Sequence, residues 1–541
     1  MTYSFNKPIN EPVRDYAPGS NEKDSLKQKI NELKTQHIEV PLIINGKDYK
    51  TDDTSSIDVP HDHSAKLGTF HNASDKEVEL AIESCMQAWV LWSKTDLEER
   101  CAIFNRAADL LANKWRDTIN AATMLNMSKN VFQAEIDAAC EMIDFFRFNS
   151  WYAYELSTQQ PMYSTEFVKN SLEMRALEGF IFAVSPFNFA SIGGNLPSSP
   201  ALMGNVALWK PASSAVLPAY YIMKLLQEAG LPDGVINFIP GSGRKIGPKV
   251  MDNPNLAGVH FTGSTNVFKG MWETVGKNIN QYKSYPRIVG ETGGKDFCIA
   301  HESANTEVLV TAMIRGAFEY QGQKCSAMSR AYIPLNIWPA VKDLFISKVE
   351  KISVGDPEDF SHFMNAVIDR PAFDSISEYI EFAKSSSEAE IITGGNCDDS
   401  KGFFIEPTTI LTTNPNFRTM CEEIFGPVLT IYIYDPSNWS NILDTIDNTS
   451  DYALTGCVIS EDKSAISDAK DRLSHAAGNF YINDKPTGAV VGQQPFGGSR
   501  ASGTNDKAGS MFNLIRWVSM RTIKETLDSP KDYRYPFMDE S

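Results

Sequence analysis

The chain has 541 residues, and 42% of them are hydrophobic, which is enough to bury the cores of about three structural units. Its 50 lysines and arginines against 68 aspartates and glutamates give a formal charge of −18. This charge argues against nucleic acid or an anionic membrane surface as a partner. No run of about 20 apolar residues is present, so we expect no membrane span.

The N-terminal sequence has neither a basic-then-apolar signal peptide nor an Arg-rich amphipathic transit segment. We therefore expect a cytoplasmic protein, or one of the mitochondrial matrix if a leader has been removed. Of the eight cysteines, the closest two, Cys85 and Cys101, stand 16 positions apart. This spacing offers no zinc pattern and favours a reducing compartment, so we expect no metal.

The first 70 or so residues are polar and rich in turns. Pro41–Ile44 is an expected strand, and Asn45-Gly46 after it is a strong signal for a hairpin. A helical block follows, because Ser74 and Glu77 form a capping-box pattern ahead of apolar residues at helical spacing. Helical patterning continues to about residue 156.

From Glu178 onward, short apolar runs alternate with helical stretches. This alternation predicts right-handed crossovers and a mostly parallel sheet, with ligands at the carboxyl ends of its strands. The expected strands are Phe180–Val184, Val206–Trp209, Val235–Ile239, Gly258–Phe261 and Arg287–Val289, and the expected helices include Ala215–Ala229 and Asn266–Asn278.

A second alternating block, from about Thr306 to Asp484, predicts a second α/β unit. Its expected strands include Ala331–Ile333, Val428–Tyr434 and Phe480–Asn483. The tail after Gly503 contains an extended, partly alternating stretch, Leu514–Leu527. We expect a strand there, far from either core and available for pairing across subunits.

A dinucleotide site is expected in the first α/β unit, but the usual GxGxxG fingerprint is missing. The stretch Gly241-Ser-Gly-Arg-Lys-Ile246 has isoleucine in place of the third glycine, which favours an ordinary turn. Phe261-Thr-Gly-Ser264 follows an expected strand and opens an expected helix. Ser264 can cap that helix and leave its N-terminus facing a phosphate, although a plain capped helix explains the same residues equally well.

Three polar side chains carry possible chemistry, each with an ordinary alternative. Cys325 has polar neighbours, and the ammonium of Lys324 can lower its thiol pKa, but a buried structural cysteine is the commoner case. Glu291 follows an apolar strand on a glycine-rich turn, where it is either a general base or a solvated turn acid. Asn188 also follows a strand, where its amide either donates to an oxyanion or bonds its own backbone.

The order of these motifs is far more specific than any one of them. This order resembles the successive signatures of the aldehyde dehydrogenase superfamily. The motifs are Pro186-Phe-Asn-Phe189, Trp209-Lys-Pro211, Phe261-Thr-Gly-Ser264, Glu291-Thr-Gly-Gly294, Gly322-Gln-Lys-Cys325, Glu423-Ile-Phe-Gly-Pro427 and Pro495-Phe-Gly-Gly498.

The resemblance implies an α/β fold with a Rossmann-type cofactor domain, a second α/β catalytic domain and a small β oligomerisation flap. It divides the chain into an NAD-binding domain at 1–157 and 178–299, a catalytic domain at 300–494 that carries the nucleophilic cysteine, and a flap and tail at 158–177 and 503–541. It also implies a homodimer or a higher homo-oligomer that acts on a small molecule.

The resemblance implies that Cys325 is the nucleophile, Glu291 the general base, and Asn188 with the Cys325 backbone N–H the oxyanion hole. A thiolate attacks an aldehyde, hydride leaves the thiohemiacetal for NAD, and a base then assists water at the thioester. The implied cofactor contacts are Ser185, Lys210, Gly263, Ser264, Thr265, Glu423 and Phe425. Ser213 replaces an acid common in NAD-preferring members, so NAD is expected with room for some use of NADP.

Longer stretches, such as Phe318–Ser326 and Gly478–Lys485, resemble the Δ1-pyrroline-5-carboxylate dehydrogenase (L-glutamate-γ-semialdehyde dehydrogenase) family within that superfamily. Those enzymes oxidise L-glutamate γ-semialdehyde to L-glutamate in the second step of proline catabolism. The implied substrate-binding residues are Glu141, Phe189, Lys324, Ser326, Gly488, Ala489 and Phe496.

Within this set, the Ser326 hydroxyl and the backbone N–H groups at Gly488 and Ala489 would hold the substrate α-carboxylate. Phe189 and Phe496 would sandwich its aliphatic chain. Alanine at position 489 departs from the family, where a serine is frequent. Two alternatives stay open: an aldehyde dehydrogenase for another ω-semialdehyde, and a cofactor-free thiol hydrolase.

Overall fold

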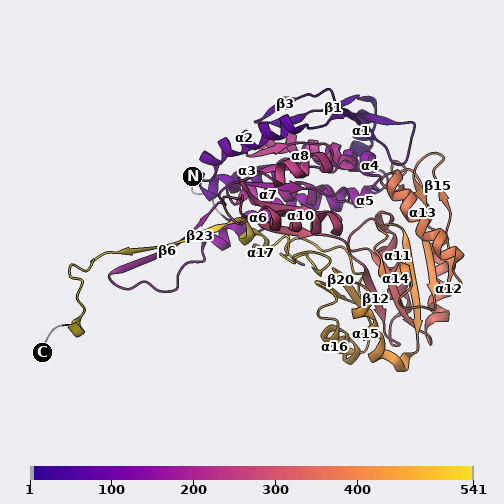
Figure 1. The fold of residues 1–541 in the computed structure, drawn as a ribbon. Helices are drawn as coiled ribbons and strands as arrows, with labels where there is room; N and C mark the ends of the chain where they lie inside the picture. Colours follow the sequence, from indigo (N-terminus) through magenta and orange to yellow (C-terminus); the bar gives the residue numbers. More distant parts are fainter. Residues whose placement is uncertain (1–4, 539–541) are drawn as a thin grey trace.

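The structure is a computed structural model that describes residues 5–538. Two α/β bodies lie against each other, and a two-stranded arm projects away from them (Figure 1). The expected first domain and the expected tail include residues 1–4 and 539–541, which lie outside the described residues. Within the described part of the chain, no helix has the length and apolar character needed to cross a membrane.

The first body contains a seven-stranded sheet with the order β11-β10-β7-β8-β9-β2-β3. The first five of these strands are parallel and almost wholly buried, as continuous apolar runs predict. All five lie within two residues of the strands expected from the sequence. In sheet order the seven strands are Arg287–Glu291, Leu256–Thr262, Phe180–Val184, Val206–Lys210, Ile236–Phe238, Leu42–Ile44 and Lys47–Tyr49.

The direction of the chain through this sheet reverses between β10 and β7. From β7 it proceeds to β8 and β9, and then crosses back to β10 and β11. Right-handed crossovers place α7 (Ala190–Leu202) and α8 (Val216–Glu228) on one face, and α9 (Gly243–Met251) and α10 (Thr265–Lys277) on the other. The carboxyl ends of β7 and β10 therefore flank the crevice where an open α/β sheet binds ligands.

The helical block of the N-terminal half packs against this sheet. The expected capping box is present, because the Ser74 backbone N–H donates to the Glu77 carboxylate at 3.1 Å. A π-helical turn at Glu135–Cys140 interrupts the block. Its helices are α2 (Asp75–Trp92), α3 (Leu97–Ala112), α4 (Arg116–Met127), α5 (Val131–Ala134) and α6 (Glu141–Ser157).

The expected hairpin at the start of the chain is also present. Asn45 and Gly46 have φ of 50° and 72°, and they join β2 to β3. Beside this hairpin lie a helix and a three-stranded sheet: α1 (Asn21–Thr35), β1 (Ile38–Val40), β5 (Lys66–His71) and β4 (Thr54–Asp58).

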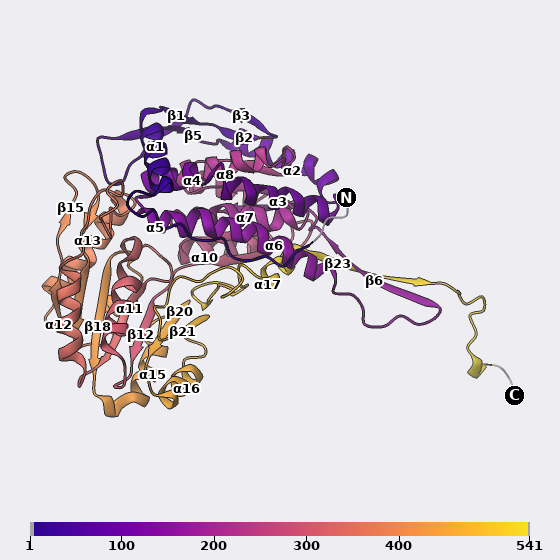
Figure 2. The same cartoon turned by 180° about the vertical axis from the view of Figure 1, so that it is seen from behind.

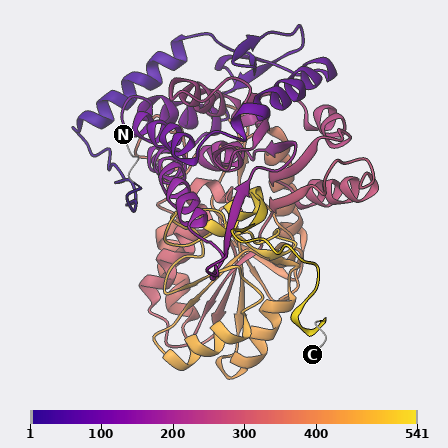
Figure 3. The same cartoon turned by 90° about the vertical axis from the view of Figure 1, so that its left-hand side faces the viewer.

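The second body has its own seven-stranded sheet, ordered β14-β17-β18-β13-β12-β20-β21 and parallel except for the β14–β17 pair. It lies below the first body in Figure 3. Its strands are Ala389–Thr393, Thr408–Thr412, Val428–Tyr434, Met328–Pro334, Asp296–Ala300, Thr455–Ile459 and Asn479–Ile482, with helices α11 (Thr306–Phe318), α12 (Trp338–Val349), α13 (Arg370–Ser385), α14 (Arg418–Cys421), α15 (Trp439–Asn448) and α16 (Lys463–Arg472). Two short pairs complete it: β15 (Cys397–Asp398) with β16 (Phe404–Ile405), and β19 (Tyr452–Ala453) with β22 (Ser499–Arg500).

The change from one sheet to the other falls between Glu291, the last residue of β11, and Asp296, the first of β12. This change comes a few residues before residue 299, the expected end of the NAD-binding domain, because β12 pairs with β13 and β20 of the second sheet. The division of the chain into functional domains stays a prediction.

The arm pairs two distant segments of the same chain (Figure 2). Its strands are β6 (Val168–Arg175) and β23 (Ser519–Thr526). The expectation of one extended stretch over Leu514–Leu527 is wrong at its start, where α17 (Met511–Leu514) and a 3-10 turn precede the strand. Leu514 and Trp517 are fully buried, so packing against the first body overrides the local alternation.

Candidate active site

A single cavity of about 450 Å³ collects most of the predicted chemistry. It lies where the carboxyl ends of the first sheet face the second body. The cavity is lined by the predicted nucleophile, Cys325, and the predicted base, Glu291. It is also lined by all seven predicted substrate-binding residues: Glu141, Phe189, Lys324, Ser326, Gly488, Ala489 and Phe496.

A strained turn brings Cys325 to this cavity. Tyr320 and Gln321, which precede it, have φ of 50° and 55°, a region that non-glycine residues seldom adopt. Hydrogen bonds hold both residues, since the Tyr320 hydroxyl donates to the Met127 carbonyl at 3.1 Å and the Gln321 amide to the Ala366 carbonyl at 2.7 Å. The backbone ahead of the thiol is thus fixed in an unusual conformation by its neighbours.

The Cys325 side chain is only 9% exposed. Burial raises the pKa of its thiol well above the ordinary value, and the carboxylates of Glu291, Asp296 and Glu423 raise it further. The expectation that Lys324 lowers this pKa is wrong. Consecutive side chains point in different directions here, and the Lys324 ammonium faces the carboxylate of Asp137 at 3.5 Å.

Glu291 ends β11, and burial raises the pKa of its carboxyl to about 8. The ammonium of Lys507 acts to lower this pKa, and the carboxylate of Asp506 acts to raise it. The segment Ala501–Thr504 runs alongside: Gly503 bridges to Glu291 itself, and the Thr504 N–H donates to the Gly290 carbonyl at 2.9 Å. Glu291 is therefore a half-buried carboxyl that lines the cavity, and its raised pKa of about 8 suits a general base.

Asn188 lies in the loop after β7 and is buried. Its amide donates to the backbone carbonyl of Gln323 at 3.0 Å, which fixes the side chain beside the turn that carries Cys325. The same amide has a second N–H that can donate to a ligand. The structure thus brings together the loop after β7 and the turn before Cys325, which are well over a hundred residues apart.

The hydroxyls of Ser326 and Thr487 lie 2.7 Å apart, and both residues are buried. Sequence reasoning did not single out Thr487, although it directly precedes Gly488. Gly488 has φ of 96°, which favours glycine at that turn. The loop that begins at Thr487 is therefore tied to the residue that follows Cys325.

Charged residues form one wall of the cavity, with the buried Lys129 packed behind it, and sequence reasoning missed both Asp137 of this wall and Lys129. The Lys129 ammonium lies 2.5 Å from an Asp137 oxygen and 4.5 Å from the centre of the Phe189 ring. Glu141 is hydrogen-bonded with the Ser191 hydroxyl, and burial, with Asp137 nearby, raises the pKa of Glu141 to about 8. The expected Glu141 and Phe189 therefore belong to a larger charged network.

Three predicted cofactor residues line a separate cavity of about 540 Å³ near the carboxyl end of β10: Ser264, Thr265 and Glu423. Ser264 caps α10 and accepts from the Val267 N–H at 3.4 Å. Glu423 accepts from the Gly294 N–H at 2.8 Å, and burial raises its pKa to about 7. The Gly263 N–H, by contrast, donates to the Glu291 carbonyl at 3.2 Å.

Lys210 ends β8 outside this cavity, and burial lowers the pKa of its ammonium to about 8. A Cβ added to Gly243, the first residue of α9, would lie 3.9 Å from the Lys210 Nζ. The expectation of an ordinary turn at Gly241–Ile246 is wrong, because this stretch opens a helix beside Lys210. A lysine and a helix N-terminus together suit an anionic or polar ligand.

Ser185 and Phe425, two further predicted cofactor residues, already have protein partners. The Ser185 hydroxyl donates to the Gly193 carbonyl at 3.0 Å and accepts from the Trp209 indole at 2.6 Å. Phe425 has φ of 57°, and its ring packs edge-on against Phe187 with centroids 5.7 Å apart. Their contact with a cofactor stays a prediction.

The aldehyde dehydrogenase family model matches residues 49–523. The chain belongs to the aldehyde dehydrogenase family. It is 52% identical to the mitochondrial Δ1-pyrroline-5-carboxylate dehydrogenase of Dictyostelium discoideum over 98% of this chain and 96% of that protein. It is 45% identical to the human protein of the same name, over 98% and 94%.

Solved structures agree with the family assignment. The Δ1-pyrroline-5-carboxylate dehydrogenase of Mycobacterium tuberculosis bound with NAD matches with a TM-score of 0.96 and 49% identity, covering 100% of this chain and 99% of that chain. The predicted aldehyde dehydrogenase fold and the predicted resemblance are thereby confirmed.

Proposed function

We propose that this chain oxidises L-glutamate γ-semialdehyde, the open form of Δ1-pyrroline-5-carboxylate, to L-glutamate with NAD⁺ in the second step of proline catabolism. The observation that carries the proposal is that one cavity holds a buried thiol, a carboxyl with a pKa of about 8, and a loop suited to a carboxylate. Relatives named for this activity match nearly the whole chain at 45–52% identity.

In this proposal Cys325 and Glu291 act as a coupled pair. The negative charge of Glu291 helps to raise the pKa of the Cys325 thiol, so at neutral pH the thiol keeps its proton in the absence of substrate. Glu291, with a pKa of about 8, is then ionised in a minor fraction of the molecules, and this ionised form is the one that accepts a proton. Attack of the Cys325 sulfur on the aldehyde carbon breaks the carbonyl π bond, and the thiol proton passes to Glu291. The resulting alkoxide accepts from the second N–H of Asn188 and from the Cys325 backbone N–H.

NAD⁺, when bound, supplies the acceptor for the hydride that leaves the thiohemiacetal carbon. The residues present fit this cofactor: Glu423 offers a carboxylate for a ribose, Ser264 opens α10 toward a phosphate, and Lys210 stands beside the start of α9. Loss of hydride leaves a thioester on Cys325. Glu291 releases the thiol proton to solvent and then takes a proton from the water that attacks this thioester. The carbon–sulfur bond breaks, glutamate leaves, and the Cys325 sulfur is freed as the thiolate.

The substrate α-carboxylate is proposed to lie at the loop of Gly488 and Ala489, with Ser326 beside it. Ala489 offers no hydroxyl there, but Thr487 supplies one on the same loop and already contacts Ser326. Phe189 and Phe496 face the aliphatic part, and Lys324 and Glu141 lie in the charged wall. A fixed distance between the thiol and this loop selects aldehydes that carry a carboxylate at the far end.

A parallel assay tests the proposal against its alternatives. We expect NADH to form from Δ1-pyrroline-5-carboxylate with NAD⁺, with slower turnover for NADP⁺ and for succinate semialdehyde. Equal or faster turnover of succinate semialdehyde would favour an enzyme for another ω-semialdehyde. No NADH from any aldehyde, together with hydrolysis of a thioester substrate in the absence of NAD⁺, would favour the thiol hydrolase.

The proposal extends to assembly and compartment. An isolated two-stranded ribbon is marginally stable in water, so the arm of β6 and β23 is proposed to pair with a second copy in a homodimer. Light scattering of the purified protein tests this. All eight cysteines are unpaired, which suits the reducing cytoplasm or mitochondrial matrix, and imaging of a tagged chain distinguishes the two.

A further inference from the structure

The N-terminal strap, defined here as residues Asn10–Arg14, forms an outer wall of the proposed substrate cavity. Asn10, Glu11 and Val13 line the same cavity as Cys325. No catalytic motif includes this segment, and the proposed function assigns it no role. Its position, more than 300 residues from the nucleophile in sequence, raises the question of what it does there.

The Asn10 side chain connects α6 to the loop that follows β21. Its amide nitrogen donates to the carboxylate of Asp144 on α6 at 2.8 Å and to the backbone carbonyl of Val491 at 2.7 Å. Its amide oxygen accepts from the Gln493 side chain at 2.9 Å. Only an amide offers two donors and an acceptor in this geometry, so the three contacts match asparagine closely.

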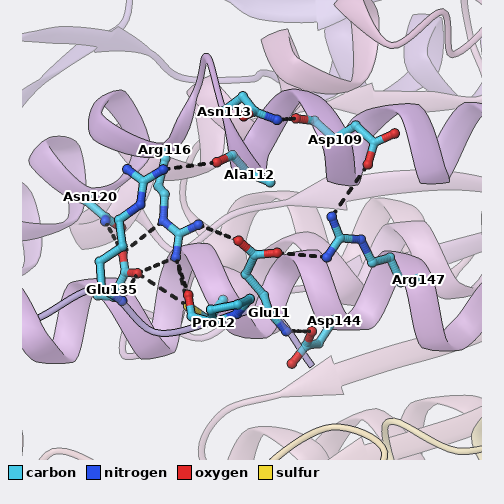
Figure 4. A network of polar contacts seen from close by, with 12 residues as sticks. Glu11, Pro12, Asp109, Ala112, Asn113, Arg116, Asn120, Glu135, Asp144 and Arg147 are labelled. Atoms are coloured by element: carbon cyan, nitrogen blue, oxygen red, sulfur yellow. Dashed lines mark hydrogen bonds and ion pairs between the residues drawn. The ribbon is translucent and has the colours of Figure 1, made fainter. Parts of the chain in front are cut away.

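The strap itself is held firmly on the helices of the first body (Figure 4). The Glu11 carboxylate accepts from Arg116 at 2.6 Å and from Arg147 at 2.7 Å, and the Glu11 N–H donates to Asp144 at 2.8 Å. Arg116, which is almost fully buried, also donates to the Pro12 carbonyl at 2.9 Å. The backbone next to Asn10 is therefore held in place by these helices. Because that backbone is already ordered, fixing the Asn10 side chain costs little additional conformational entropy.

The loop from Thr487 to Gln493 is held by side-chain hydrogen bonds at both ends, and Val491 also packs against Phe145 and Phe148 of α6. Thr487 is bonded to Ser326 at its start, and Val491 and Gln493 are bonded to Asn10 near its end. Gly488 and Ala489, whose N–H groups are the proposed carboxylate donors, lie between these points. The donors can hold a carboxylate well only if this loop keeps one conformation.

We propose that Asn10 is a positioning residue for carboxylate recognition: it fixes the loop that presents Gly488 and Ala489. The proposal rests on the proposed function. It assigns substrate specificity in part to the N-terminal strap, which is distant in sequence from the loop. A merely structural brace would instead support the whole fold and affect all aldehydes alike.

The decisive variant is Asn10→Asp, which keeps the shape of the side chain. It replaces the amide nitrogen that donates to Asp144 and to the Val491 carbonyl with an oxygen that can only accept. The matched control is Asn31→Asp, which adds the same charge at an exposed position on α1. For Asn10→Asp we expect KM for glutamate semialdehyde to rise roughly tenfold, as loss of a hydrogen bond to a charged or fixed partner predicts. Turnover and KM for butanal, which has no carboxylate, should change less than about twofold.

Equal losses for both aldehydes, or an unchanged KM for the semialdehyde, would overturn the proposal. If Asn10→Asp does not fold, Gln493→Ala removes one contact from the loop side and should shift KM in the same direction. Hydrogen–deuterium exchange gives a readout that needs no substrate. Amides of residues 487–493 should exchange faster in Asn10→Asp and not in Asn31→Asp, and unchanged exchange would reject the proposal. Failure of the wild type to oxidise the semialdehyde would reject only the proposed function.

Discussion

The hydroxyl of Ser326 lies 2.7 Å from the hydroxyl of Thr487, and this contact joins the proposed nucleophile to the proposed carboxylate anchor. Ser326 follows Cys325 directly, whereas Thr487 begins the loop of Gly488. The two ends of a short aldehyde acid would thus meet groups that hold each other in place. Although position 489 is alanine, the loop still has a hydroxyl, which Thr487 supplies.

Thr487→Val tests this contact, because valine keeps the shape and removes the hydroxyl. We expect KM for glutamate semialdehyde to rise about five- to tenfold, since the Ser326 hydroxyl loses its partner in a buried site. Steady-state kinetics with butanal as the control substrate provides the measurement. A similar loss for butanal would show that the contact supports the nucleophile and not the anchor.

Cys325→Ala is expected to abolish NADH formation while the protein still folds, because in the proposed chemistry the thiol makes the covalent bond between enzyme and substrate. Thermal unfolding followed by circular dichroism serves as the folding control. Cys298→Ala is the matched control, since Cys298 is buried in the second sheet away from the cavity lining. Dehydrogenase activity that survives in Cys325→Ala would refute the assignment of the nucleophile.

Glu291→Gln should slow hydrolysis of the thioester more than its formation. Glutamine cannot accept the proton of the attacking water. In the first half of the reaction the loss of this proton acceptor is partly offset, because removing the Glu291 charge lowers the pKa of the Cys325 thiol. Stopped-flow mixing of enzyme, substrate and NAD⁺ should show one rapid equivalent of NADH followed by a slow phase. Equal slowing of both phases would argue against Glu291 as the base for hydrolysis.

The rate of hydrolysis should rise with pH around a midpoint near 8, because Glu291 acts only when it is ionised and its pKa is about 8. Asp506→Asn removes a like charge, so it should move the midpoint to lower pH. Lys507→Met removes an opposite charge and should move it to higher pH. Shifts in the same direction for both variants would mean that another group controls the profile.

The buried pair of Arg116 and Glu135 gives a prediction on stability (Figure 4). Arg116→Met leaves the Glu135 carboxylate without its main partner inside the protein, so the free energy of unfolding should fall by about 3–5 kcal/mol. The double variant with Glu135→Gln should recover a large part of this loss, because no buried charge is then left unpaired. Denaturant titration measures both, and equal stability of the two variants would contradict this explanation.

The sheets were predictable from the sequence because their strands are short apolar runs buried on both faces. Phe180–Val184 and Val428–Tyr434 have the expected limits for this reason. The stretch that begins at Leu514 was not predictable, because its helical turns depend on a core to which Trp517 contributes from the end of the chain. Local alternation carries no information about such distant packing.

In the site, too, local motifs were predictable from the sequence, whereas contacts between distant residues were not. The order of motifs identified Cys325 and Glu291, but the sequence could not show that Lys324 points away from the thiol toward Asp137. The contact of Thr487 with Ser326 and the contacts of Asn10 could not be predicted, because their partners lie far away in the chain. Residues that act through contacts of this kind become visible only when the fold is known.

The run of chain that supports Glu291 also leads into the arm. Gly503 bridges to Glu291, and the same segment continues through Trp517 into β23 within about twenty residues. A partner that steadies the arm would therefore also steady the strand that carries the base. Specific activity is then expected to fall when the enzyme is diluted, because the activity of each molecule depends on the concentration of the protein itself.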